Sequence, residues 1–315
     1  SKHNSFGIAI NIFNKKDIIE DERRNVKMLE LTNINSTFNL NNGVKIPCVG
    51  YGTFRTPADV AEQAVKEAIE TGYRHIDTAA VYGNEEAVGK GIKDSGIKRE
   101  DLFVTSKLWN TNRGYEQTKK AFQETLDRLQ MDYLDLYLIH WPANEKQFGD
   151  DAAKINAETW RAMEDLYNEG KIRAIGVSNF MPHHIAELMK TAKVAPAVDQ
   201  IEVHPGWPHT EEVKYLQAHN ILVEAWAPLG GQGAKVLTNP TMIQIADKYQ
   251  KTPAQVCLRW VLQQGILPLP KSVHKERMIS NQNIFDFELT DEDMCKISLL
   301  PNLGGQCADP DEVDY

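Results

Sequence analysis

The stretch "YRHIDTAAVYGNEEAVGKGIKDSG", residues 73–96, contains the unit from which most of the chain is built. Its first five residues are typical of a short buried strand, and residues 84–96 have the spacing of an amphipathic helix that ends at a glycine. The loop between them begins directly after Asp77 and contains Tyr82. A strand that leads into a helix is the repeating unit of folds with a parallel sheet.

The same order of strand and helix recurs along the chain. We expect strands at residues 49–54, 73–77, 102–109, 133–141, 172–178, 196–203, 221–229 and 266–272. We expect helices at residues 57–72, 84–96, 114–130, 157–170, 182–192, 210–220, 239–250, 253–265 and 275–284. Eight strand–helix units predict an α/β fold, a (β/α)8 TIM barrel in a single domain.

A β-hairpin is predicted ahead of the first barrel strand. Residues 36–48, "STFNLNNGVKIPC", carry Asn42 and Gly43 as a turn signal between two short runs. A doubly wound sheet is the alternative to the barrel, but such a sheet usually carries a GxGxxG fingerprint in its first turn. Residues 50–54, "GYGTF", match only the first two glycines of that fingerprint, which favours the barrel.

The first 27 residues differ from the rest because they are polar, charged and without clear periodicity. We treat residues 1–27 as an N-terminal extension and residues 28–315 as one barrel domain. Two interpretations of the extension stay open. In the first, it is a translated leader ahead of a native start at Met28 or Val26; the codons of Arg23 and Arg24 can spell a ribosome-binding sequence, which favours this interpretation. In the second, it is a real but dispensable arm of the protein.

Composition excludes several classes of function. The 315-residue chain has a net charge of −9, which argues against a nucleic-acid partner. No apolar run approaches the length of a membrane span. The four cysteines show no CxxC spacing and no metal-ligand motif is present, so we expect reduced thiols, a cytoplasmic protein and no metal.

Chemically capable side chains stand at the ends of the predicted strands. Catalytic residues of a TIM barrel lie at the carboxyl ends of its strands. Read in chain order from the second strand, these ends carry Asp77, Lys107, His140, Ser178 with Asn179, Gln200, Trp226 and Lys271. Nearly every one of these positions is polar, ionisable or aromatic, which predicts an active site at this end of the barrel.

Four of these groups fit one reaction. Tyr82 is a weak acid, and a neighbouring ammonium such as that of Lys107 favours its phenolate and so makes it a better proton donor. Asp77 would keep Lys107 charged, and His140 would orient a carbonyl oxygen. Each residue alone is more often a packing or ion-pair residue, but together they can protonate a carbonyl. None of them supplies a reductant, so we expect a nicotinamide cofactor.

The sequence resembles the aldo-keto reductase family over residues 36–310. The motifs that carry the resemblance are "GYRHIDTAAVYGNEEAVG", "TSKLW", "YLDLYLIHWP", "IGVSNF", "VDQIEVHP" and "LPKS" followed by Arg277 and Asn281. The resemblance implies that Tyr82 is the general acid, that Lys107 lowers its pKa, and that Asp77 pairs with Lys107. It also implies that His140 positions the carbonyl.

The resemblance implies NADPH as the cofactor. Lys271 and Arg277 are two cations suited to a 2′-phosphate, which favours NADPH over NADH. Trp226 would stack under the nicotinamide ring, and residues 229–235 would cover the pyrophosphate. The implied cofactor residues are Gly52, Thr53, Asp77, Ser178, Asn179, Gln200, Trp226, Leu229, Lys271, Ser272, Arg277 and Asn281.

The implied substrate is a small carbonyl compound. Phe54, Trp109 and Trp141 would line the pocket, with Tyr82 and His140 at its floor. The short C-terminal segment resembles the bacterial branch that reduces diketo-gluconates and glyoxals, and it suggests an open pocket. We expect an oxidoreductase of the CH–OH donor class that is a monomer or a weak oligomer.

Two rival functions remain. One is a non-catalytic, NADPH-binding, redox-sensing regulatory protein of the same fold, which the intact set of four residues disfavours. The other is an unrelated isomerase or lyase on a (β/α)8 barrel, which the absence of paired catalytic carboxylates and metal ligands at strand ends disfavours.

Overall fold

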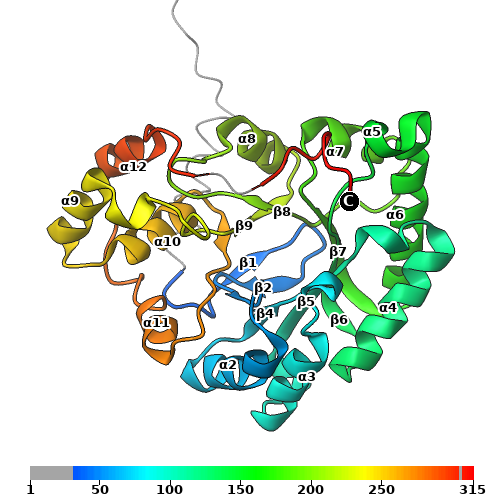
Figure 1. Ribbon diagram of the computed structural model, residues 1–315, viewed down its shortest axis with the longest axis horizontal. Helices are drawn as coiled ribbons and strands as arrows, with labels where there is room; N and C mark the ends of the chain where they lie inside the picture. Colours follow the sequence, from blue (N-terminus) through cyan, green and yellow to red (C-terminus); the bar gives the residue numbers. More distant parts are fainter. Residues whose placement is uncertain (1–30, 305–306) are drawn as a thin grey trace, which may run out of the picture.

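Eight parallel strands form a closed barrel at the centre of the protein (Figure 1). A computed structural model describes residues 31–304 and 307–315. The strands are β3 (Tyr51–Gly52), β4 (His75–Asp77), β5 (Phe103–Leu108), β6 (Leu134–Ile139), β7 (Ile172–Ser178), β8 (Val198–Glu202), β9 (Leu222–Trp226) and β10 (Leu267–Pro268). They pair in chain order from β3 to β10, so the predicted order of strands is confirmed.

The seam between β3 and β10 closes the barrel. Gly50 N donates to Pro268 O at 3.1 Å, and Gly52 N donates to Pro270 O at 3.0 Å. Glycine is required at position 50, because a Cβ atom there would lie 2.8 Å from the Nδ1 atom of His75. The first and last strands of the barrel are therefore neighbours although more than two hundred residues separate them.

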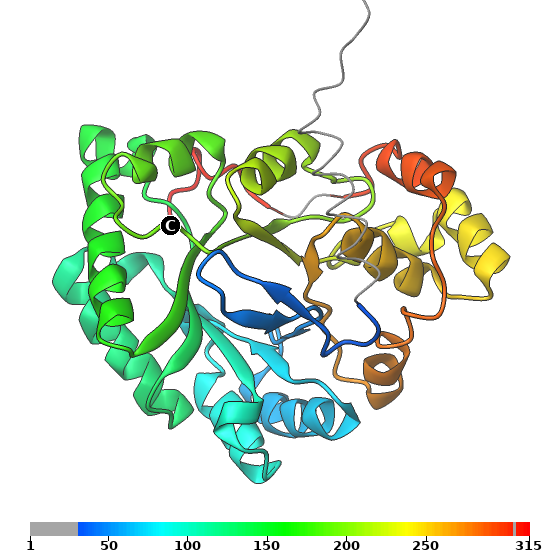
Figure 2. The ribbon, with the colours of Figure 1, turned by 180° about the vertical axis from the view of Figure 1, so that it is seen from behind.

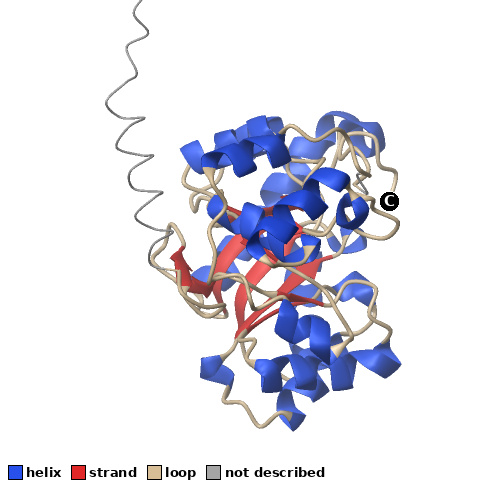
Figure 3. Cartoon of the chain, turned by 90° about the vertical axis from the view of Figure 1, so that its left-hand side faces the viewer, coloured by secondary structure: helices blue, strands red, loops and turns tan. Residues whose placement is uncertain are grey.

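Helices surround the strands on the outside (Figure 2). They are α2 (Ala58–Thr71), α3 (Glu85–Asp94), α4 (Tyr115–Leu129), α5 (Glu145–Phe148), α6 (Ala152–Asn168), α7 (Pro182–Met189), α8 (Thr210–Ala218), α9 (Pro240–Tyr249), α10 (Pro253–Gln263), α11 (Lys275–Ser280) and α12 (Asp291–Ser298). All nine predicted helices are present. Figure 3, which looks across the barrel, shows the strands enclosed between helices.

Three helical segments differ from the prediction. Helix α6 begins at Ala152 rather than at residue 157, and Asn156 in its second turn forms hydrogen bonds of 2.8 and 3.1 Å with the backbone of Ala143. Helix α12 was not predicted, although Thr290 and Asp293 form a capping box at its start. The single turn α5 lies in a segment for which no helix was predicted.

Packing between helices and strands follows the sequence periodicity. Helix α4 buries Phe122, Leu126 and Leu129 on one face, and β6 is buried along its whole length. Strands covered on one side by helices and on the other by the barrel interior need this continuous burial. Each large apolar side chain that is fully buried contributes about 1.5–3 kcal/mol.

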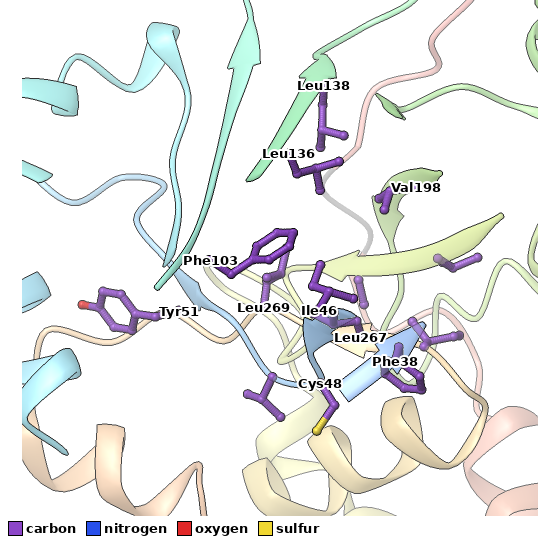
Figure 4. Packing of buried hydrophobic residues seen from close by; sticks show 14 of the residues in the cluster. Phe38, Ile46, Cys48, Tyr51, Phe103, Leu136, Leu138, Val198, Leu267 and Leu269 are labelled. Carbon is purple, nitrogen blue, oxygen red and sulfur yellow. The ribbon is translucent and has the colours of Figure 1, made fainter. Parts of the chain in front are cut away.

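The predicted hairpin is present and covers the amino ends of the barrel strands. It consists of β1 (Thr37–Asn39) and β2 (Lys45–Pro47), with Gly43 at φ 86° in the turn. Figure 4 shows Phe38 and Ile46 of the hairpin beside Phe103 and Leu267, which lie at the amino ends of β5 and β10. With this end covered, the site must open at the carboxyl ends of the strands.

Leu31 is the first of the described residues that contributes to the core. The predicted extension of residues 1–27 and both of its interpretations lie outside the described residues. Within the described ranges, no helix combines the length and apolar character that crossing a membrane requires.

Candidate active site

Asp77, Lys107 and Tyr82 meet inside the carboxyl end of the barrel. Asp77 ends β4, and Lys107 lies near the end of the neighbouring β5. The Lys107 Nζ atom donates to Asp77 Oδ1 at 2.6 Å, to Thr78 O at 3.0 Å and to Tyr82 Oη at 3.0 Å. These three bonds use the three protons of an ammonium group, so Lys107 is held in one position.

Burial and the ion pair set the protonation states of these groups. Burial alone would lower the pKa of Lys107, but Asp77 and Tyr82 outweigh burial and raise it, so Lys107 keeps its charge. Burial raises the pKa of the Tyr82 phenol, and the Lys107 ammonium opposes that rise without cancelling it. Tyr82 therefore holds a proton at neutral pH, next to a cation that would stabilise its phenolate.

His140 lies beside the phenol as a neutral ring. It directly follows β6, and its ring centroid lies 5.8 Å from that of Tyr82 in an edge-on arrangement. Burial, helped by the charge of Lys107, lowers the pKa of His140 well below its ordinary value. A neutral imidazole has one N–H to donate, which suits it to a carbonyl oxygen rather than to an anion.

The loop that carries Tyr82 is held by a residue that sequence reasoning missed. Asn84 donates from Nδ2 to Thr53 O at 3.0 Å and to Thr56 O at 3.1 Å, and it accepts from Thr78 Oγ1 at 3.0 Å. Tyr82 itself ends the short 3-10 helix η1 (Ala80–Tyr82). Asn84 directly precedes α3 but its side chain forms no cap hydrogen bond with that helix, so the preference of Asn for helix starts does not predict this role.

The residues predicted at the nicotinamide end lie together on adjacent strand ends. Gln200 Nε2 donates to Asp77 Oδ2 at 2.8 Å, and Ser178 Oγ donates to Gln200 O at 2.8 Å. Asn179, at φ 59°, accepts from Trp226 Nε1 at 3.1 Å and donates to His140 O at 3.0 Å. Gln200 is thus a direct partner of Asp77, which the sequence did not reveal.

The residues predicted at the phosphate end follow β10, the strand next to β9, which carries Trp226. Lys271 and Arg277 are exposed cations, and neither forms an ion pair with another described residue. Ser272 and Asn281 are buried. Gly52 and Thr53 lie across the seam, where Thr53 Oγ1 donates to Asp77 O at 2.9 Å.

The loop of residues 229–235 packs close to its own backbone. Leu229 packs against the core, and a Cβ at Gly230 would lie 2.5 Å from the Cβ of Ala234, so this position needs glycine. Arg55 Nη1 donates to Gln232 Oε1 at 2.7 Å, which ties the loop to the segment after β3.

These features fit a bound dinucleotide phosphate. Two exposed cations without carboxylate partners among the described residues suit a phosphate group. The half-buried indole of Trp226 offers an aromatic face beside the tetrad formed by Asp77, Tyr82, Lys107 and His140. The donor set therefore agrees with NADPH.

Aromatic rings lie near the phenol, among them those that we predict to line a substrate pocket. Phe54 is 48% exposed, and its centroid lies 5.2 Å from that of Tyr82. The Trp109 ring lies 5.3 Å from that of His140. Trp141 is buried. A further ring, that of Tyr315, stacks on Trp109 at 6.1 Å and meets Trp141 edge-on at 5.5 Å.

The segment that carries Tyr315 is fixed by a cluster of two histidines and an aspartate. Asp311 accepts from His183 Nε2 at 2.7 Å and from His184 Nε2 at 2.8 Å. These three are the one group of potential metal ligands among the described residues. His184 Nδ1 accepts from Met181 N, so the neutral ring must keep its proton on Nε2, where a metal would bind. The cluster therefore acts as a tether for the segment rather than as a metal site.

Comparison with known proteins gives consistent results. Residues 48–300 match the model of the Aldo/keto reductase family. The chain is 50% identical to a glyoxal reductase of Bacillus subtilis over 90% of this chain and 99% of that protein. It is similar to the crystal structure of an aldo-keto reductase from a deep-sea metagenome library, with a TM-score of 0.83, 46% identity and coverage of 89% and 100% of the two chains. A Bombyx mori aldo-keto reductase solved in complex with NADP has a TM-score of 0.78 and 38% identity, over 85% of this chain and 98% of that chain.

Proposed function

Because the chain belongs to the aldo/keto reductase family, we propose that it reduces small dicarbonyls and keto-sugars, with Tyr82 as the proton donor. The chain is an NADP-dependent oxidoreductase that reduces carbonyl groups to alcohols. The CH–OH donor class that we expected describes the oxidation of an alcohol, which is this reaction in reverse. The family of the chain was correctly predicted from its motifs.

The observation that carries the proposed mechanism is the position of Lys107 between Asp77 and Tyr82. Its ammonium donates to both side chains at 2.6 and 3.0 Å. Tyr82 is protonated at neutral pH because burial raises its pKa, so it has a proton to give to a carbonyl oxygen. Once the proton has left, the phenolate faces a fixed positive charge. Asp77 and Gln200 keep that charge in place.

His140 would hold the substrate oxygen against the phenol. Its neutral ring can donate an N–H to a carbonyl without adding charge to the pocket. NADPH, when bound, supplies the hydride to the carbonyl carbon. Trp226 would stack against its nicotinamide ring, while Lys271 and Arg277 would bind the 2′-phosphate.

The proposed substrate class rests on the pocket walls and on a relative. Phe54, Trp109, Trp141 and Tyr315 are aromatic, so they would accept uncharged carbonyl compounds without requiring a carboxylate or phosphate. The relative named glyoxal reductase supports small dicarbonyls. We propose a cytoplasmic monomer or weak oligomer with one catalytic domain at residues 28–315. The four cysteines are all free thiols, which supports a reducing compartment.

A substrate panel with NADPH tests the proposal. Glyoxal, methylglyoxal, a diketo-gluconate, an aldose and benzaldehyde would be compared by multiple-turnover oxidation of NADPH. We expect the highest kcat/KM for the dicarbonyls. The Tyr82→Phe variant should lose about 10²–10⁴-fold in kcat while its affinity for NADPH, from fluorescence titration, stays the same. Near-normal turnover by this variant would refute the assignment of the acid. A wild-type protein that binds NADPH but reduces no carbonyl would favour the regulatory alternative.

A further inference from the structure

A second pair of titratable side chains lies inside the barrel, below the reacting groups. His75 precedes Asp77 by two residues on β4, and Glu224 precedes Trp226 by two residues on β9. Side chains two apart on a strand point to the same face, so both groups point into the barrel. Both side chains are completely buried.

The Lys107 ammonium and the Gln200 amide favour a charged Glu224, but burial and the charge of Asp77 outweigh them and raise the pKa of its carboxyl group. Neither of its oxygens takes part in a hydrogen bond with a described residue, and the same is true of Nε2 of His75. His75 Nε2 and Glu224 Oε2 face each other at 3.9 Å, which is too long for a hydrogen bond. An ionised carboxylate buried in this way is strongly disfavoured, so the group keeps its proton.

The tautomer of His75 agrees with a protonated Glu224. His75 Nδ1 lies 3.2 Å from Pro47 O, and a carbonyl can only accept, so Nδ1 carries the proton of the ring. His75 Nε2 then presents a lone pair toward Glu224, which suits a neutral acid and not a carboxylate. Burial raises the pKa of Glu224 to about 8 and lowers the pKa of His75 to about 4.

The charges around Glu224 come from three elements. Asp77 and His75 lie on β4, Lys107 lies on β5, and Tyr82 lies on η1. On the two strands adjacent to β9, the residues in register with Glu224 are Gln200 of β8 and Leu267 of β10, and neither side chain titrates. With Glu224 neutral, the Asp77–Lys107 pair has no net charge. With Glu224 neutral, the phenolate of Tyr82 is the only uncompensated negative charge among these groups. With Glu224 ionised, the phenolate would be a second negative charge, and its formation would be less favourable.

We propose that Glu224 is a positioning residue for the reaction. As a buried neutral acid, it leaves the Asp77–Lys107 pair to act on Tyr82 alone. When Glu224 ionises at alkaline pH, its negative charge makes Tyr82 hold its proton more tightly. This inference rests on the proposed function of Tyr82. It predicts that the wild-type enzyme keeps carbonyl reduction, which needs the phenol, to a higher pH than a variant without the carboxyl group. Oxidation of an alcohol, which needs the phenolate, begins at a correspondingly higher pH.

The test compares Glu224→Gln with the wild type and with a matched control. Glutamine has the shape of the protonated acid and cannot ionise. The control is Asp199→Asn, because Asp199 is also fully buried and unpaired among the described residues, and burial raises its pKa well above the ordinary value. Asp199 adjoins Gln200 on β8 and so points to the other face of the barrel wall.

The readout is the pH profile of kcat for reduction and for oxidation, from pH 6 to 10.5. We expect Glu224→Gln to equal the wild type near pH 6.5 and to shift both alkaline midpoints down by about one pH unit, because removing a buried unit charge changes a neighbouring pKa by an amount of this order. Asp199→Asn should leave the midpoints unchanged. A purely structural role for Glu224 would lower the rate at every pH without moving a midpoint, and that result would overturn the inference.

Infrared spectroscopy gives a readout that does not depend on turnover. The carbonyl band of protonated carboxylic acids should be present in the wild type at pH 6.5 and lose one component in Glu224→Gln, while the component of the buried Asp199 remains. If Glu224→Gln does not fold, Asp199→Asn is used instead. The carboxylic-acid band that remains in this variant should disappear between pH 6.5 and 9.5 as Glu224 ionises. The absence of any such band would overturn the inference. A wild type that shows the band but reduces no carbonyl would instead contradict the proposed function.

Discussion

Replacing Lys107 by Met should lower the free energy of unfolding, because the substitution breaks the buried ion pair between Lys107 and Asp77. Methionine keeps the apolar stem but removes the ammonium that Asp77 Oδ1 contacts at 2.6 Å. Asp77 would keep only the bond from Gln200 Nε2, at 2.8 Å. Removing one partner of a buried ion pair costs about 3–5 kcal/mol, so we expect the free energy of unfolding to fall by about 4 kcal/mol.

A second substitution separates stability from catalysis. In the double variant Asp77→Asn with Lys107→Met, no uncompensated charge is left in the barrel. Replacing both partners of a buried pair is often close to neutral, so most of the lost stability should return, to within about 1–2 kcal/mol of the wild type. Activity should not return, because Tyr82 would still lack the cation that stabilises its phenolate, and we expect a loss of about 10²–10⁴-fold in kcat.

Urea denaturation followed by tryptophan fluorescence measures the stability, and oxidation of NADPH with methylglyoxal measures the activity. The slope of each unfolding curve must match that of the wild type for the free energies to be compared. A single variant that loses less than about 1 kcal/mol would refute the buried charge pair. A double variant that regains turnover would refute the role of Lys107 in the reaction.

Three further predictions follow from other parts of the structure. Lys271→Ala should weaken the binding of NADPH at least about tenfold and leave that of NADH nearly unchanged, as measured by fluorescence titration; equal losses would argue against a 2′-phosphate site. Because folding raises the pKa of Glu224 to about 8, its contribution to stability is complete below its unfolded pKa of 4.5 and is lost as the pH rises through 8. The stability of Glu224→Gln relative to the wild type should therefore increase between pH 4.5 and 8, by at most about 1.4 kcal/mol per pH unit, and a flat difference in urea denaturation would contradict this. Tyr315→Ala should raise the KM for benzaldehyde by about 2–10-fold with a smaller change for methylglyoxal, and equal changes would show that its ring does not face the substrate.

The order of the strands and the tetrad could be predicted because both depend on local patterns. A buried run followed by an amphipathic helix identifies each unit, and the barrel places the ends of all strands at one mouth. Asp77 and Lys107 end up in contact because they terminate neighbouring strands. Helix α6 was predicted too short, and the bonds of Asn156 to Ala143 have no periodic signature.

Contacts across the barrel were beyond sequence reasoning. His75 and Glu224 face each other only because the sheet closes, and the bond from Gln200 to Asp77 depends on the tilt of strands that lie far apart in the chain. Tyr315 belongs to an extended segment without periodicity, so nothing local indicated that its ring would stack on Trp109. Such pairs depend on register and closure, which periodicity does not encode.

The seam between β3 and β10 also has a consequence for synthesis. A ribosome completes Gly50 long before Pro268, the residue whose carbonyl accepts its hydrogen bond. Until then, β3 has an unpaired edge, and each newly made strand presents another. Unpaired edges of parallel sheets are prone to join other chains, and contacts of this sequence separation form slowly. The growing chain is thus most exposed to aggregation just before its last strand emerges, and substitutions that weaken the seam should reduce the yield of soluble protein more than the stability of the finished barrel.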